Sequence, residues 1–250
     1  MAQYDLGIFI GHGTSEKDKS YDPGATSGGH KEHEVASRIG NKVYEILTNN
    51  GYKVHLDEQS YKDNDTKGNT YRMNYVMSIH INAGKGEGAE FIVPIKESYF
   101  SIEQNVLNDL ATLGLRNRGV KSRDYSTEKF IQRFNGIKES GSDYYGELRD
   151  AWNNGVSLSI LEVGFIDSND INIITNNYDK IAYSIAKAIM KEDGKELKPT
   201  LPTPTTSPDN LYYRVVVGSF KDRSLAEKRI NDLKAKGFTE AFITTYTKGW

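Results

Sequence analysis

The stretch Tyr75–Gly84, YVMSIHINAG, places a histidine inside a run that otherwise has the composition of a buried strand. The run alternates and is rich in β-branched side chains, which favours a strand over a helix. A lone histidine in such a strand is usually a core residue whose neutral ring is hydrogen-bonded to a backbone carbonyl. The alternative is that His80 is a metal ligand, and that interpretation requires partner ligands elsewhere in the chain.

The composition limits the class of protein. A chain of 250 residues can form one sizeable core and a small second unit. It has no cysteine, so disulfides and cysteine-ligated zinc are excluded, and any metal must be held by histidine and carboxylate side chains. The net charge of −2 and the lack of a basic run argue against a nucleic-acid partner. No apolar run reaches the roughly 18 residues of a membrane helix, so we expect no membrane insertion.

A proline-rich segment divides the chain. Four of the six prolines lie in KPTLPTPTTSPDN, where proline and threonine alternate without large apolar residues. This composition predicts an extended linker over residues 193–210. The linker separates residues 1–192, with a net charge of −5, from residues 211–250, with a net charge of +4. The small C-terminal unit is therefore the basic one.

Strand and helix patterns alternate along the first part. Strand patterns cover Tyr4–Ile10, Tyr52–Leu56, Tyr75–Asn82, Ala89–Val93 and Val156–Val163, and helical patterns cover 32–49, 99–115, a segment starting at Asn169, and 178–190. This alternation predicts a three-layer α/β domain. Residues 116–150 have weak periodicity, and we interpret them either as a flap beside a site or as an irregular surface connection.

Two histidines lie where predicted strands end. His12 follows the first strand between two glycines, which let backbone or ligand approach closely. His80 stands near the end of another strand, and sites in α/β sheets form at such ends. Two histidines and one carboxylate would make a zinc site with a fourth position for water. The candidate carboxylates are Glu32 and Glu34, just before the apolar stripe of the first predicted helix.

Glu162 is a charged residue within the otherwise apolar strand SLSILEVGF. A lone buried carboxylate costs several kcal/mol unless it is paired, hydrogen-bonded or protonated. A carboxylate base is also needed beside a hydrolytic zinc site, so Glu162 is the candidate for that role.

Five sequence blocks together carry a resemblance to a known family. IGHG, YDPGA, GHKEHEVA, SIHINAG and LEVGFIDSND, in this order and spacing, resemble zinc-dependent N-acetylmuramoyl-L-alanine amidases of the Amidase_3 type over about residues 3–192. The resemblance implies a three-layer sandwich with a twisted, mostly parallel six-stranded sheet. It also implies hydrolysis of the amide bond between N-acetylmuramic acid and L-Ala in peptidoglycan, leading to cell-wall lysis.

The resemblance assigns roles to particular residues. The family's zinc ligands fall on His12, Glu32 and His80, with Glu34 as the alternative carboxylate, and its catalytic glutamate falls on Glu162. Zn²⁺ would polarise the carbonyl and lower the pKa of its water towards about 7, and the glutamate would pass the proton to the leaving amine. The remaining histidines match no ligand. We interpret His30 and His33 as surface or rim residues and His55 as a sheet residue.

Three segments depart from the family pattern. Residues 13–22 are longer than usual, the connection before SIHIN lacks the usual Arg-and-Asn helix, and DYYGELRDAWNNG stands where a short apolar strand is expected. The substrate-contacting residues are therefore left unassigned.

The C-terminal unit resembles one SPOR-type repeat, a module that binds glycan strands of peptidoglycan. YRVVVGSFKDRSLAEKRINDLKAKGF has a strand-then-helix pattern that ends at Gly237, and a second strand follows. One unit of about 40 residues makes too small a core alone. We therefore expect a homodimer in which residues 211–250 of two chains complete one domain. The alternatives are a chain that continues past residue 250 or a unit that only packs on the catalytic domain.

The sequence thus predicts a lytic peptidoglycan amidase with a wall-binding tail. MAQYDLGIFIGHG lacks the basic and apolar regions of a secretion signal, so we expect synthesis in the cytoplasm and release through a phage holin or cell lysis, as for an endolysin or autolysin. One rival is a wall-binding protein with an inactive enzyme domain, which the intact candidate residues argue against. The other is a zinc peptidase that cuts within the stem peptide.

Overall fold

The computed structural model of the chain describes residues 4–15, 18–59, 73–197, 218–237 and 242–243. It divides into two compact units, Met1–Lys198 and Pro199–Trp250. The boundary falls within the predicted linker. The described residues before that boundary still pack on the first unit, because Asp193 accepts a hydrogen bond from the Tyr52 hydroxyl at 2.7 Å and Leu197 is buried.

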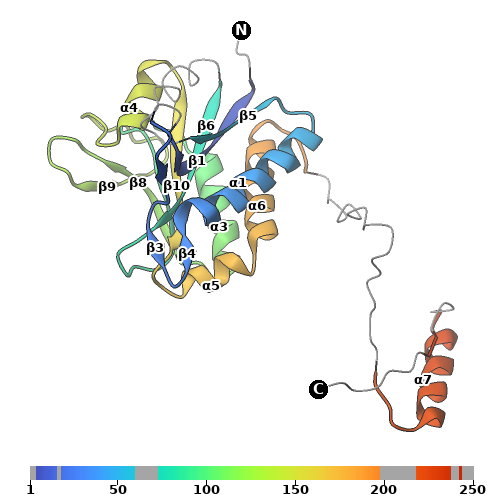
Figure 1. Ribbon diagram of the computed structural model, residues 1–250. Helices are drawn as coiled ribbons and strands as arrows, with labels where there is room; N and C mark the ends of the chain where they lie inside the picture. Colours follow the sequence, from blue (N-terminus) through green and yellow to red (C-terminus); the bar gives the residue numbers. More distant parts are fainter. Residues whose placement is uncertain (1–3, 16–17, 60–72, 198–217, 238–241, 244–250) are drawn as a thin grey trace. The chain divides into compact units, whose positions relative to one another are not determined.

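The first unit is built on one twisted sheet (Figure 1). In the described residues its strand order is β2-β1-β6-β10-β7-β8-β9, and β5 also pairs with β1. The pairs β1–β5, β1–β6, β6–β10 and β7–β8 are parallel, whereas β10–β7 and the short edge strands β2 and β9 are antiparallel. The predicted six-stranded, mostly parallel sheet is confirmed, and the two edge strands extend it. The strands are β1 (Leu6–Thr14), β2 (Tyr21–Asp22), β5 (Val54–Gln59), β6 (Tyr75–Asn82), β7 (Ala89–Ile92), β8 (Asn117–Arg123), β9 (Phe130–Gln132) and β10 (Ser157–Phe165).

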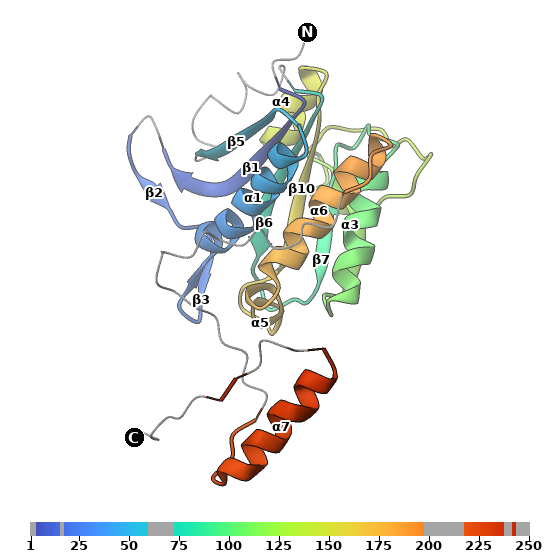
Figure 2. The same cartoon turned by 90° about the vertical axis from the view of Figure 1, so that its right-hand side faces the viewer.

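Helices cover both faces of this sheet, which confirms the three layers (Figures 1 and 2). One face carries α1 (Glu32–Asn49), α3 (Ser101–Thr112) and α6 (Tyr178–Glu192), and the other carries α4 (Gly146–Asn153). The short α5 (Asp170–Thr175) follows β10, and a hairpin of β3 (Thr26–Ser27) and β4 (His30–Lys31) precedes α1.

The core follows the hydrophobic patterns of the sequence. The predicted apolar stripe of α1 is buried on the sheet, where Ile39 and Val43 are fully covered. On the opposite face, Leu148 of α4 joins Val76 and Ile160 in a second apolar cluster. Burial of each such side chain contributes about 1.5–3 kcal/mol. The sheet is thereby held rigid beneath the residues at its edge.

Residues 116–150, which the sequence left open, contain β8, β9 and the first part of α4. Arg133 organises this region although it is almost completely buried. Its guanidinium donates to the carbonyls of Ile95, Glu97 and Ile137 at 2.7–2.9 Å, and to the Ser122 hydroxyl at 2.8 Å. One buried cation therefore ties the segment after β7 to the loop after β9.

In the second unit the structure describes α7 (Arg223–Ala235), as the sequence predicted. The Asp222 carboxylate caps its first turn by accepting from Ser224 N at 2.7 Å, and Gly237 follows in the left-handed region. The two predicted strands of this unit lie largely outside the described residues. None of the helices in the described ranges is both long and apolar enough to cross a bilayer.

We predict that Arg133→Gln destabilises the first unit by about 3 kcal/mol, because several buried carbonyls lose their donor. The main thermal transition of the full chain should then fall by roughly 10 °C. Differential scanning calorimetry measures this shift. The matched control is Arg116→Gln at an exposed position, which should stay within about 0.5 kcal/mol of the parent. Equal transition temperatures for the two variants would contradict the role given to Arg133.

Candidate active site

A strained turn presents His12 at the end of β1. His12 has φ 66°, in the left-handed region that side chains other than glycine rarely adopt, and Gly13 follows with φ 101°. His33 steadies the turn, since its Nδ1 lies 2.9 Å from the Gly11 carbonyl oxygen. His33, predicted to be a surface or rim residue, is half-buried and supports the site. Strain of this kind is typical of functional positions.

The carboxylate of Glu32 connects the two predicted histidines. Glu32 is the first residue of α1, and its Oε2 accepts from Ala25 N at 2.9 Å and lies 3.1 Å from His12 Nε2. Its Oε1 accepts from Ile81 N at 3.1 Å and lies 3.0 Å from His80 Nδ1. Each carboxylate oxygen therefore meets one backbone N–H and one imidazole.

The alternative carboxylate, Glu34, points elsewhere. It is exposed and pairs with Lys31 at 2.7 Å. The structure brings Glu32, and not Glu34, to both histidines.

The three side chains favour a positive charge between them. Burial opposes ionisation of Glu32, yet hydrogen bonds from His12 and His80 hold its pKa far below the usual value. The contact with Glu32 raises the pKa of His12. Burial works against the charged form of His80, but Glu32 and the nearby carboxyl groups raise its pKa to about 9. A place that stabilises protons in this way also suits a divalent cation, which would displace them.

The residues fit a metal ion. One donor atom from each of His12, Glu32 and His80 lies within 4.8 Å of the others. Glycines make this approach feasible: a Cβ on Gly24 would stand 2.6 Å from the His12 ring, and one on Gly11 would stand 2.5 Å from His80 Nδ1. The imidazoles keep about a fifth of their surface exposed, 23% and 20%, so a fourth position can face solvent. Two histidines and a glutamate are the donor set of hydrolytic zinc sites.

Asp22 positions His12 from behind. Its Oδ2 lies 2.9 Å from His12 Nδ1, and its Oδ1 accepts from Gly24 N at 3.0 Å. A carboxylate on the far nitrogen fixes the ring and leaves Nε2 to act as the ligand atom. Asp22 belongs to the YDPGA block, but its place behind His12 was not predicted from the sequence.

Glu162 lies beside this cluster on β10. In the sheet it is paired with His80 of β6 on one side and with Glu90 of β7 on the other. Its Oε2 is buried and has no hydrogen-bond partner among the described residues. Burial raises the pKa of Glu162 to about 7, and the carboxylates of Glu32 and Glu90 act in the same direction. This group can exchange a proton near neutral pH.

Two further carboxyl groups were missed by sequence reasoning. Glu147 lies in the first turn of α4 and faces the site. Burial raises the pKa of Glu147, and the charges of His80 and His12 lower it. Its Oε2 lies 3.4 Å from the Ser78 hydroxyl. Nothing in DYYGELRD marks this orientation. Glu90 could have been found, because it carries the same signal as Glu162, a charge within an apolar strand.

The comparisons with known proteins agree with this geometry. A family model described as N-acetylmuramoyl-L-alanine amidase matches residues 7–191. The chain belongs to this amidase family. It is therefore a peptidoglycan hydrolase, and the bond cut by the family joins N-acetylmuramic acid to L-Ala. A second model, described as a SPOR domain, matches residues 185–245, starting before the predicted boundary at residue 211.

Similar proteins come from several bacteria. The chain is 26% identical over 244 residues to a sporulation-specific N-acetylmuramoyl-L-alanine amidase of Bacillus subtilis, covering 92% of this chain and 82% of that protein. Among solved structures, the CwlD amidase of Clostridioides difficile in complex with the GerS lipoprotein has a TM-score of 0.56 at 20% identity, covering 77% of this chain and 99% of that one. Cwp6 from Clostridium difficile has the same TM-score at 24% identity, and the match spans 77% of this chain but only 29% of Cwp6. These two structures show that the amidase fold is shared.

We predict that Gly11→Ala weakens metal binding roughly 10- to 100-fold, because the added methyl displaces the His80 ring. Zinc content after dialysis against a buffered chelator measures the loss. Gly146→Ala is the matched control, since its methyl would meet only Arg149 Nη2 at 3.8 Å and its φ is not positive. A folded Gly11→Ala protein with unchanged metal affinity would show that the tight packing on His80 is unimportant.

Proposed function

We propose that this amidase is zinc-dependent, with His12, Glu32 and His80 as the ligands and Glu162 as the general base. The observation that carries the proposal is the orphaned Oε2 of Glu162, buried beside a His-Glu-His cluster. A buried carboxylate oxygen without a partner costs free energy, and a proton-transfer role accounts for it.

Zinc is the metal we propose because the donor set is His₂Glu with a solvent-facing side and the chain has no cysteine. When bound, zinc supplies Lewis acidity that polarises the scissile carbonyl and makes a water molecule a stronger acid. Asp22 keeps the His12 ring oriented throughout, and the backbone N–H groups of Ala25 and Ile81 keep the Glu32 carboxylate in place.

Glu162 performs the proton transfers in this proposal. With its pKa raised to about 7 by burial, it accepts a proton at Oε2 from the attacking water and is still acidic enough to give it up. The proton then goes to the nitrogen of the departing L-Ala. Without that step the leaving group would be an amide anion, which is too basic to leave.

The proposal also covers the role of the C-terminal unit and the place where the enzyme acts. SPOR domains bind peptidoglycan, so we propose that residues 211–250 hold the enzyme on the wall. We also propose that it acts after release from the cytoplasm by a holin or by cell lysis. The name of the Bacillus subtilis relative, sporulation-specific, favours an autolysin freed at mother-cell lysis over a phage endolysin.

The test is to incubate the zinc-loaded protein with purified peptidoglycan and to identify the newly exposed groups. We expect new L-Ala amino termini and no new reducing sugars. Glu162→Gln should keep its zinc and lose about 100-fold or more in rate. Other new amino termini would instead identify a stem peptidase. Wall binding without any cleavage would indicate an inactive enzyme domain, and near-normal turnover by Glu162→Gln would remove the assigned base.

The homodimer stays a prediction. If residues 211–250 of two chains complete one domain, light scattering should show a mass that doubles with increasing concentration. Cleavage in the linker near Pro204 should return the catalytic unit to a monomer. A monomeric mass at high concentration would exclude this mode of assembly.

A further inference from the structure

Three basic side chains line the sheet next to the catalytic residues. Lys121 and Arg123 are two residues apart on β8, so they share a face. Lys121 is paired with Ile92 of β7, and Ile92 is paired with Ile160 of β10, two residues before Glu162. The two cations therefore lie on the same face of the sheet as the proposed base.

A β-bulge places Arg118 beside Lys121 and Arg123, and the three side chains form a basic row on β8. The register shifts from Ala89↔Asn117 to Phe91↔Val120, so β8 has one residue more than β7 between these pairs. Gly119 makes the bulge feasible with φ 83°. As a result Arg118 and Lys121 both reach the carboxylate of Glu90.

The row carries excess positive charge. Arg118 Nε lies 2.6 Å from Glu90 Oε2, and Lys121 Nζ contacts the same oxygen. One buried carboxylate thus balances two cations. Arg123 adds a third, whose ion pair with Glu128 is long, at 3.9 Å, and involves a carboxylate that is 68% exposed. Such a pair neutralises little charge.

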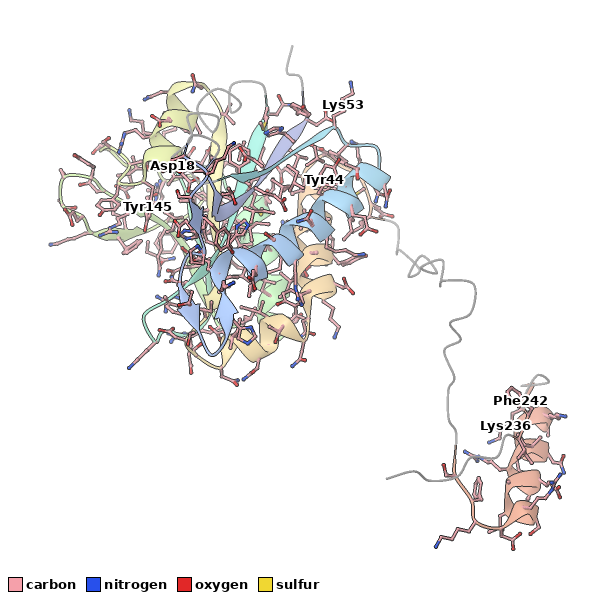
Figure 3. All side chains as sticks on the ribbon, in the orientation of Figure 1. Asp18, Tyr44, Lys53, Tyr145, Lys236 and Phe242 are labelled. Carbon is pink, nitrogen blue, oxygen red and sulfur yellow. The ribbon has the colours of Figure 1, made fainter. Side chains whose placement is uncertain are left out.

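Aromatic rings hold these cations without neutralising them. The Arg123 guanidinium lies 3.7 Å from the Tyr144 ring centroid and 5.2 Å from that of Phe130. Arg118 lies over Phe165 at 5.0 Å. Tyr145, labelled in Figure 3, is the third ring near Arg123, at 6.0 Å. Cation–π contacts fix the positions of the charges, which remain able to attract an anion.

Around the histidine cluster, by contrast, the ionisable side chains are acidic. Asp22, Glu147 and Glu162 are carboxyl groups around the histidine cluster. A substrate with a neutral acyl side and an anionic peptide side would be oriented by this contrast, with the peptide directed towards β8.

The distances match a peptide of about two residues. β8 is the second strand from β10, so its backbone lies roughly 10 Å from that of Glu162. An extended peptide covers about 3.5 Å per residue. The long basic side chains shorten the remaining gap, so a carboxylate on the second residue beyond the cleaved amide can reach them.

We propose that Arg118, Lys121 and Arg123 form a subsite that binds a free carboxylate of the stem peptide, on the second residue after the bond that is cut. The inference rests on the proposed amidase function and names the part of the substrate that sets its specificity.

The experiment compares two substrates that both have the γ-carboxyl group of D-Glu blocked as a methylamide: N-acetylmuramoyl-L-Ala-D-Glu with a free α-carboxylate, and the same compound with the α-carboxylate as a carboxamide. The zinc-loaded full-length protein should have a kcat/KM at least about tenfold higher for the acid. Arg123→Gln and Lys121→Gln should each lower kcat/KM for the acid about tenfold and leave the carboxamide nearly unchanged. Arg123→Lys should recover part of the preference, because it keeps the charge. The control Lys180→Gln, on the exposed surface of α6, should behave as the parent.

Equal rates of the parent on both substrates would overturn the proposal, as would variants that lose both activities in parallel. If neither compound is cleaved, the proposed function fails on these substrates, and the subsite is then tested by calorimetry. Glu162→Gln is titrated with the two uncleaved compounds. Tighter binding of the acid that disappears in the Arg123→Gln, Glu162→Gln double variant would uphold the subsite. Equal or absent binding would overturn it.

Discussion

The site depends on the contacts of one carboxylate, that of Glu32. It receives the backbone N–H of Ala25 before α1 and that of Ile81 in β6, and it meets His12 near the end of β1. Four separate segments are thereby held at one point by a single buried charge. A charge in that position is stable only because its partners surround it, so the start of α1, the strained end of β1 and the end of β6 are mutually dependent.

Close packing of backbone makes this arrangement feasible. Gly11 and Gly24 leave no room for a side chain against His80 and His12, and His12, with its left-handed backbone, has its ring between Asp22 and Glu32. The strain of that turn is opposed by the hydrogen bonds of Asp22 and His33. The apolar layers on both faces of the sheet keep these parts rigid enough for donor atoms to stay within 4.8 Å.

The site is also electrically asymmetric. Carboxyl groups gather around the histidines, and Glu162 has its pKa raised to about 7 by burial among them. On the far side of β7 the bulge at Gly119 gathers cations around Glu90. The same sheet face thus offers a centre for proton transfer at one place and attraction for an anion two strands away. Arg133 supports that second part, since it ties the loops around β8 and β9 together.

The fold class, the mostly parallel sheet and the order of its main strands and helices along the chain could be predicted from the sequence, as could the candidates His12, His80 and Glu162, and Glu32 with Glu34 as the alternative carboxylate. The elements follow from local periodicity, and the roles of the residues are implied by the resemblance that the five short blocks carry. The spacing of the family blocks favoured Glu32 over Glu34, and the fold shows why: the start of α1 turns Glu32 towards β6 and leaves Glu34 exposed beside Lys31. The tertiary structure alone revealed Asp22, Glu147 and the row on β8. Those contacts depend on a bulge, a helix entry angle and the pairing of distant strands, and sequence spacing does not encode such geometry.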